Sequence, residues 1–125
     1  MLPHANASSL LVVRRLVRNS ARPIELWLEP MGTVFRLPPG RELEVICQGS
    51  RPGKLEQERH PDGHLALYAW PGARFTVLEG GQEVYSESEV STEFPTRPGG
   101  TVREMIELLF GSFEDRRVLF RDMRS

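Results

Sequence analysis

Glycine-centred turns recur at nearly even spacing between residues 32 and 81, and this cadence narrows the possible folds sharply. The turn glycines, most of them close to a proline, are Gly32, Gly40, Gly53, Gly63, Gly72 and Gly80. Proline presets one turn dihedral, and glycine supplies the positive φ that a chain reversal requires. Short segments separated by such turns predict antiparallel β-strands.

The segments between the turns have the composition of strands. We expect strands over 10–18, 24–29, 33–37, 41–48, 54–60, 65–70, 73–79 and 82–86. Because 65–70 and 73–79 are rich in apolar residues, they are expected to form the centre of a sheet. In 24–29, one face carries Ile24, Leu26 and Leu28, and the other carries Glu25, Trp27 and Glu29. This alternation predicts one core face and one face that is at least partly in contact with water.

The C-terminal part of the chain has a helical pattern. Thr101 and Glu104 form a capping box, apolar residues follow at helical spacing, and Gly111 can end the helix. Ser112 and Asp115 can cap a second helix through Phe120, although a strand over 118–120 is an alternative. We therefore expect a flexible N-terminus over 1–9, a β-domain over 10–86, an acidic Pro/Gly-rich tether over 87–100 and a helical segment over 101–125.

Together these signals predict one mainly-β domain. The expected fold is an antiparallel β-sandwich of seven or eight strands, similar to immunoglobulin-like or jelly-roll sandwiches. One or two C-terminal helices would cover an end of it or be exchanged with a partner. A chain of 125 residues is long enough to bury its own core.

The composition indicates the cellular compartment in which the protein functions. The lone Cys47 is typical of a reducing compartment, and we expect it to be a small buried hydrophobe. The apolar run at 10–13 is short and precedes its arginines, unlike an export signal, and no apolar run approaches the roughly 20 residues that span a bilayer. We therefore expect a cytoplasmic protein. A net charge of −1 provides no bulk field to attract a polyanion.

Three sequence blocks carry a resemblance. They are IELWLEPMG at 24–32, LPPGRELEV at 37–45 and YAWPG at 68–72. Together they resemble blocks in small uncharacterised bacterial β-domain proteins, over about half of the chain. The shared features are turn and core residues, so the resemblance implies a bacterial β-sandwich and transfers no catalytic or binding residue.

The pattern of the sequence favours binding over catalysis. No stretch has the spacing of a known catalytic or cofactor motif, so we expect no enzyme activity and no cofactor. We expect instead an accessory, adaptor or inhibitor-like subunit that binds another protein or a second copy of itself. The expected interface combines an apolar helical stripe with an acidic segment: Met105, Ile106, Leu109, Phe110 and Phe113, with Glu83, Glu87 and Glu89.

Two alternatives stay open. Arg14, Arg15 and Arg18 could share a face with Trp27 or Trp70 and bind single-stranded nucleic acid on a small β-barrel by charge and stacking. In the other alternative, a hairpin would bring His60 and His64 together beside Asp62, which are residue types that bind zinc or another divalent ion in a metal site or metal-dependent enzyme.

Overall fold

The computed structural model describes residues 11–124, with side chains described through residue 121, and contains eight strands followed by two helices. The strands are β1 (Leu11–Arg18), β2 (Ile24–Glu29), β3 (Thr33–Leu37), β4 (Glu42–Gly49), β5 (Glu56–Arg59), β6 (Leu65–Tyr68), β7 (Ala73–Glu79) and β8 (Gln82–Ser86). The helices are α2 (Val102–Phe110) and α3 (Phe113–Arg124). All the expected strands are present with similar bounds, and α3 continues beyond the expected end at Phe120. The flexible N-terminus expected over 1–9 lies outside the described residues.

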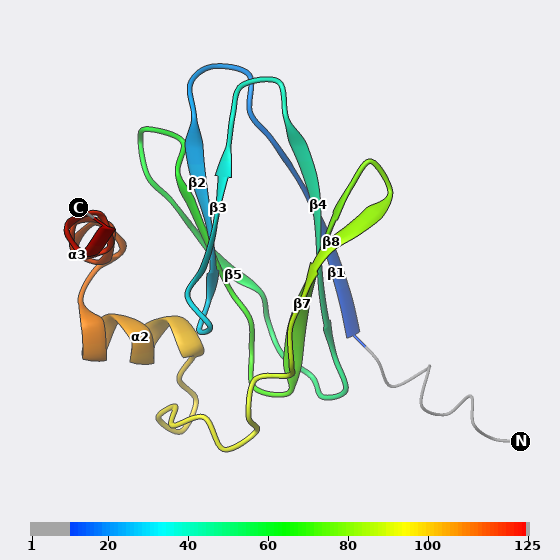
Figure 1. The fold of residues 1–125 in the computed structure, drawn as a ribbon. Coiled ribbons are helices and arrows are strands. Elements are labelled where there is room, and N and C mark those ends of the chain that lie inside the picture. Colours follow the sequence, from blue (N-terminus) through cyan, green and yellow to red (C-terminus); the bar gives the residue numbers. More distant parts are fainter. Residues whose placement is uncertain (1–10, 125) are drawn as a thin grey trace, which may run out of the picture.

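The strands form two four-stranded sheets that pack face to face, with both helices beside one of them (Figure 1). The first sheet has the order β1-β4-β7-β8, and the second sheet has the order β3-β2-β6-β5. This arrangement confirms the expected β-sandwich with C-terminal helices. Its edge strands are β1 and β8 in the first sheet and β3 and β5 in the second.

The strand arrangement differs in two ways from the expected antiparallel sandwich with 65–70 and 73–79 at the centre of one sheet. β2 and β6 are parallel, with Leu26 opposite Leu65. β6 and β7, which were expected to lie side by side, belong to opposite sheets, where each is an interior strand. A turn in which Ala73 N–H donates to Trp70 C=O (2.9 Å) joins them. The link crosses between the layers, so each strand is central without pairing with the other.

The main core lies between the two sheets. It consists of the inward-facing residues of both layers, among them Leu26, Leu28, Leu37, Val45, Cys47, Leu67, Phe75 and Val77. The alternation along β4 places Leu43, Val45 and Cys47 inward, as their spacing indicates. Burial raises the pKa of the Cys47 thiol to about 12, so this residue acts as a small core hydrophobe.

The second sheet is buried on its outer face as well, which corrects the expectation of a wet face on β2. Trp27 is 5% exposed and Glu29 is 4% exposed. Trp27 lies beneath the helices in a second apolar cluster that consists of Trp27, Ala66, Tyr68, Val102, Ile106 and Phe113, and Glu29 lies against Arg116 of α3. The strand pattern alone identifies a polar face, but it cannot show that a segment about 75 residues later covers that face.

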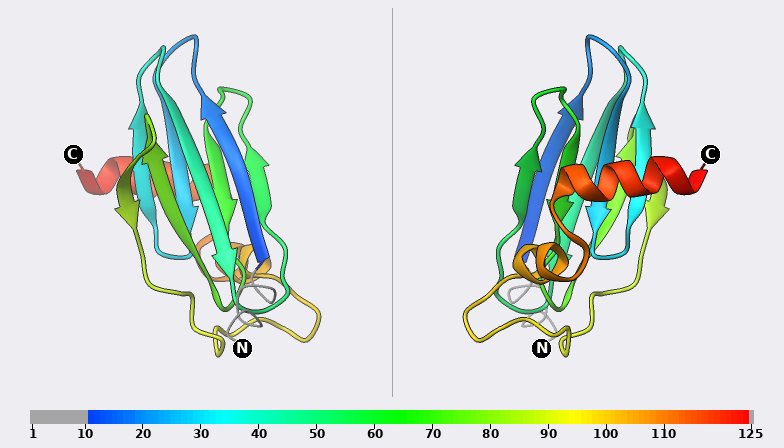
Figure 2. Two further views of the ribbon diagram at one scale, coloured as in Figure 1. Left: turned by 90° about the vertical axis from the view of Figure 1, so that its right-hand side faces the viewer. Right: turned by 90° about the vertical axis from the view of Figure 1, so that its left-hand side faces the viewer.

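The helices pack on the second sheet of their own chain. α3 lies across the strands of the second sheet (Figure 2). Its Phe113 ring meets Trp27 edge-on, with ring centres 5.6 Å apart, and Phe120 meets the same ring at 5.1 Å. α2 begins near the sheet and runs outward, so that its last turn projects from the domain (Figure 1).

The segment 87–100, expected as a tether, forms no regular element but is bound to the sandwich over part of its length. Val90 is buried, and its N–H donates to Ala73 C=O (2.8 Å) while its C=O accepts from Gly72 N–H (2.8 Å). Residues 87–100 connect β8 to α2, and the Val90 hydrogen bonds attach this connection to the sandwich.

Most of the turn glycines have the conformation that the cadence predicts. Gly40 and Gly63, for example, have φ of 84° and 94°. Gly53 is different, because it is not among the positive-φ glycines. A Cβ atom at Gly53 would lie only 1.9 Å from Cδ1 of Trp70. The indole is 5% exposed, and its Nε1–H donates to Arg51 C=O (2.9 Å), so Gly53 is required for close approach.

Replacing Gly53 with alanine is expected to lower the free energy of unfolding by about 2 kcal/mol, because the added methyl group forces the indole of Trp70 out of its packed position. Urea denaturation followed by tryptophan fluorescence measures the change. Lys54→Ala, at the exposed neighbouring position, is the control and is expected to have little effect. A Gly53→Ala protein as stable as the control would contradict the close contact.

Candidate functional site

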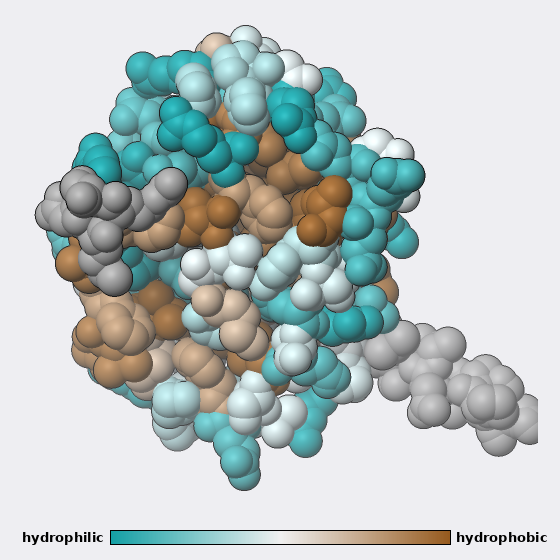
Figure 3. Space-filling view, in the orientation of Figure 1, coloured by the Kyte–Doolittle hydropathy of each residue, from teal (hydrophilic) through white to brown (hydrophobic). Residues whose placement is uncertain are grey.

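An apolar pocket opens between the helices and the β2–β3 turn. It has a volume of about 250 Å³, and its walls include Pro30, Ile106, Phe110, Leu119 and Phe120. Phe110 is 59% exposed and Leu119 is 56% exposed. Figure 3 shows hydrophobic residues gathered over α2 on this side of the molecule. The pocket and its rim therefore present apolar surface that the chain's own fold leaves uncovered.

A buried ion pair lies against this pocket. Glu29, at the end of β2, and Arg116, on α3, both line it and are both buried. Arg116 Nε lies 3.4 Å from Glu29 Oε2 but has no hydrogen-bond partner among the described residues. The other guanidinium nitrogens are bonded: Nη1 donates to Gly111 C=O (2.7 Å), and Nη2 donates to the Tyr68 hydroxyl (2.6 Å).

The surroundings of this pair shift its acid–base behaviour. Burial raises the pKa of Glu29 above its ordinary value of 4.5, and the Arg116 charge only partly opposes this. Burial likewise raises the pKa of Tyr68, although Arg116 opposes the shift. The Tyr68 hydroxyl donates to Glu58 Oε1 (3.0 Å), so it remains a neutral link between a cation and a carboxylate.

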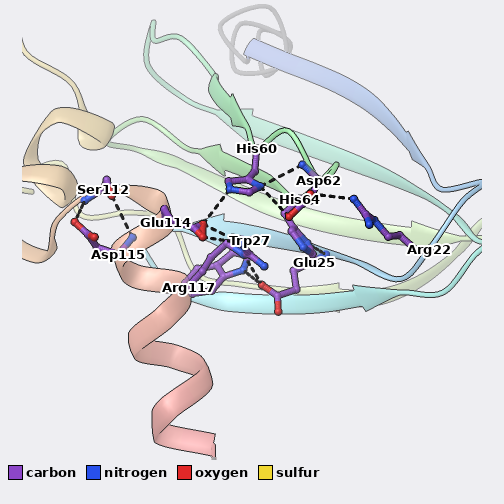
Figure 4. Close-up of polar contacts among 10 residues, drawn as sticks. All are labelled: Arg22, Glu25, Trp27, His60, Asp62, His64, Ser112, Glu114, Asp115 and Arg117. Atoms are coloured by element: carbon purple, nitrogen blue, oxygen red, sulfur yellow. Dashed lines mark hydrogen bonds and ion pairs between the residues drawn. The ribbon is translucent and has the colours of Figure 1, made fainter.

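A polar network attaches the start of α3 to the second sheet (Figure 4). Arg117 Nε donates to Glu25 Oε1 (3.1 Å), and Trp27 Nε1–H donates to the same oxygen (2.9 Å). Partial burial alone would raise the pKa of Glu25, but these hydrogen bonds lower it below its ordinary value. Arg117 Nη1 also pairs with Glu114 Oε2 (3.1 Å). The predicted cap is present beside them, where Ser112 Oγ accepts from Asp115 N–H (3.1 Å).

The two histidines of the β5–β6 turn take part in this network and face different partners. His60 Nε2 lies 3.0 Å from Glu114 Oε2, and His60 Nδ1 accepts from Asp62 N–H (3.2 Å). His64 Nδ1 instead accepts from Glu25 N–H (2.8 Å). Desolvation lowers the pKa of His64, with a further contribution from the Arg117 charge, so its imidazole is neutral at pH 7.

This geometry does not assemble the ligand set that the hairpin suggested. The rings of His60 and His64 are 6.1 Å apart, and Asp62 pairs with Arg22 (2.9 Å). Within the described part of the chain, no three His, Cys, Asp or Glu side chains form a group that could hold a metal ion. The histidines attach the turn to α3 and to β2.

The arginines and tryptophans named for nucleic acid are not brought together either. Arg14, Arg15 and Arg18 are exposed on β1, at the edge of the first sheet. Trp27 and Trp70 are each 5% exposed, and Trp27 lies beneath the helices of the second sheet. Neither indole offers an open face on which a base could stack.

The residues expected at a protein interface divide into buried and exposed groups. Ile106 and Phe113 are buried against the chain's own sheet, and Met105 is half-buried, whereas Leu109 and Phe110 are exposed. In the acidic segment, Glu83 and Glu89 are exposed. Glu87 is half-buried, and its carboxylate accepts from the Tyr85 hydroxyl (2.7 Å) and from Phe75 N–H (3.3 Å).

Sequence reasoning missed Glu29, Arg116 and Leu119. The sequence signal for Arg116 was its position three residues after Phe113, which places a charged side chain on the same helix face as an apolar residue.

No helix in the described part of the chain is both long and apolar enough to cross a membrane. Comparison with protein-family models, curated proteins and solved structures found no match.

Proposed function

We propose that this chain is a non-enzymatic protein-binding domain, an accessory or adaptor subunit, whose partner docks on α2 and α3. One observation carries the proposal. Of the large hydrophobic side chains that are exposed in the described residues, half lie on these two short helices: Leu108, Leu109, Phe110, Val118 and Leu119. Clustered apolar exposure of this kind marks interaction surfaces more often than chance.

The pocket supplies the shape that such an interface needs. Binding energy concentrates where a large apolar side chain of the partner enters a desolvated pocket surrounded by further contacts. Here Phe110 and Leu119 flank a pocket of about 250 Å³, and the buried Ile106 and Trp27 form part of its lining. The proposed occupant is an aromatic or long aliphatic side chain on an amphipathic helix of another protein.

Contacts between α3 and the second sheet hold the helical surface in place and favour a preformed site. Trp27, Phe113 and Phe120 pack together, and the ion pair between Arg117 and Glu25 holds α3 to the sheet. A surface that is held in this way loses little conformational entropy on binding. The pocket is therefore present before the partner arrives.

The test compares two pairs of substitutions in the full chain. Phe110→Asp with Leu119→Asp places two charges on the helical surface, and Gln82→Asp with Val84→Asp places two charges on exposed positions of β8 in the first sheet. Affinity capture from the native host with mass spectrometry identifies the partner, and titration with the purified partner measures affinity. The helical variant is expected to weaken binding at least about tenfold, and the control less than about twofold.

Sedimentation velocity of both variants covers the case in which the partner is a second copy. A dimer that the helical variant dissociates would support the surface with the chain itself as partner. A monomer that captures no stoichiometric protein, or a partner that binds both variants equally, would contradict the proposal.

A further inference from the structure

The edge strands β1 and β5, one from each sheet, lie next to each other along one side of the sandwich (Figure 2). A groove lies between them. Its first part, about 290 Å³, is lined from both sheets: Arg15, Leu16, Val17, Arg18, Ile24, Gln57, Arg59, Leu65 and Leu67. A second hollow continues from Arg18, Ile24 and Arg59 to the β1–β2 and β5–β6 turns. These shared residues make the two hollows one groove.

Two arginines at this groove have exposed side chains that make no ion pair or hydrogen bond with the described residues. They are Arg15 on β1 and Arg59 on β5. The neighbouring Arg18 and Arg22 are paired, with Glu42 (2.6 Å) and Asp62 (2.9 Å). The unbalanced charge of the groove is therefore positive.

Alternation along β5 concentrates this charge inside the groove. Glu58 points to the opposite face, where it accepts a hydrogen bond from Tyr68 beneath the helices. Gln57 and Arg59 line the groove instead. The glutamates of β5 alternate with Gln57 and Arg59, so this strand turns its one basic side chain, and no carboxylate, to the gap between the sheets.

The floor and the walls add two further properties. Val17, Ile24, Leu65 and Leu67 form an aliphatic floor. β1 pairs only with β4, and β5 only with β6, within the described residues, so each has an outer edge of unpaired backbone groups. An extended peptide can add a strand to such an edge, with main-chain hydrogen bonds for affinity and side-chain contacts for specificity.

We infer that this groove binds an extended acidic segment of another protein, which adds as a strand to the free edge of β1. Aliphatic side chains of the segment cover the floor, and its carboxylates pair with Arg15 and Arg59. The eight-residue length of β1 is enough for a strand of ordinary size. This surface is separate from the helical surface proposed above.

The charge and the lining of the groove favour an acidic peptide strand over a second copy of this chain and over nucleic acid. A second copy of the chain that paired through β1 would place Arg14 and Arg15 of one strand close to those of the other, which is unfavourable. Charges of this kind protect a free edge from self-association while still admitting a strand of opposite charge. Nucleic acid would also be attracted, but the aliphatic floor provides no aromatic ring for stacking.

The experiment uses the full chain and labelled eight-residue peptides. One peptide alternates threonine with, in turn, valine and glutamate, so that valine and glutamate share the face of the strand that turns to the groove. A second peptide has lysine in place of glutamate, and a labelled oligothymidylate serves as the nucleic-acid probe. Fluorescence anisotropy at low salt is expected to show saturable binding of the acidic peptide, at least tenfold tighter than binding of either other probe. Hydrogen exchange of the β1 amides is expected to slow when the acidic peptide is bound.

Charge reversal tests the two arginines. Arg15→Glu with Arg59→Glu is expected to weaken peptide binding at least tenfold. Arg36→Glu with Arg97→Glu changes the net charge equally at exposed positions away from the groove, and it is expected to change affinity less than twofold. Equal loss in both variants, tighter binding of the oligothymidylate, no peptide binding, or unchanged exchange in β1 would each overturn the inference.

Discussion

Replacing Arg116 with methionine is expected to lower the free energy of unfolding by about 3–5 kcal/mol. The substitution keeps most of the buried volume but leaves the Glu29 carboxylate, 4% exposed, without its cation. It also removes the donors that reach Tyr68 and Gly111. Chemical denaturation of both proteins at pH 7.5 measures the difference. A change below about 1 kcal/mol would show that the pair does not stabilise the fold.

The pH dependence of this variant identifies Glu29 as the source of the loss. Burial raises the pKa of Glu29 in the folded protein, so between the unfolded and folded values the folded state holds a proton that the unfolded state has released. Stability from this group is therefore present at low pH and is lost as the pH rises through that interval. Without the Arg116 charge the interval widens upward.

A second substitution provides the control. Lowering the pH from 7.5 to 5.5 is expected to restore part of the stability of Arg116→Met. Adding Glu29→Gln removes the buried charge and is expected to recover about 2 kcal/mol at pH 7.5 and to abolish this pH response. A double variant as unstable as the single one would mean that the lost hydrogen bonds, and not the unpaired carboxylate, cause the effect.

Truncating Trp27 to alanine is expected to cost about 3–5 kcal/mol, a loss as large as that in a central core position. The indole contacts Phe113 and Phe120 on α3 and donates to Glu25. Its removal therefore takes away the main apolar contact between α3 and the sheet. Urea denaturation measures the global loss, and hydrogen exchange is expected to show α3 opening more readily than the strands of the first sheet.

Leu119→Ala is the matched control for this prediction, because Leu119 lies on α3, the helix that Trp27 contacts, and its side chain is 56% exposed. It is expected to change stability by less than about 0.5 kcal/mol. If Trp27→Ala destabilised the protein no more than Leu119→Ala, α3 would not be held to its own sheet by this ring. The helices would then be free to exchange with a partner, as the sequence alone allowed.

Local features of the candidate surfaces could be predicted from the sequence. The capping residues Thr101 and Ser112 lie where their motifs indicate, and Leu109 and Phe110 are exposed as an interface stripe requires. Ile106 has the same helical spacing and is nevertheless buried. Periodicity identifies an apolar face, but which part of that face a sheet covers depends on where the helix is docked.

The groove between β1 and β5 likewise combines residues that the sequence identifies with a spatial arrangement that the sequence does not reveal. The charge of Arg15 and Arg59 is evident in the sequence, but the two residues are 44 positions apart and belong to different sheets. Only strand order brings them to one side of the molecule. The pairing of Arg116 with Glu29, which are 87 positions apart, is equally invisible to any local pattern.

The sequence by itself determined the strands, their turns and the helix caps, because φ preferences, alternation and capping act over a few neighbouring residues. It did not determine that β2 and β6 pair in parallel, that β6 and β7 separate into opposite sheets, or that the helices bury Trp27 and Glu29. The tertiary structure decided these, because they depend on burying apolar surface between segments distant in the chain, a non-directional force that sequence spacing does not encode.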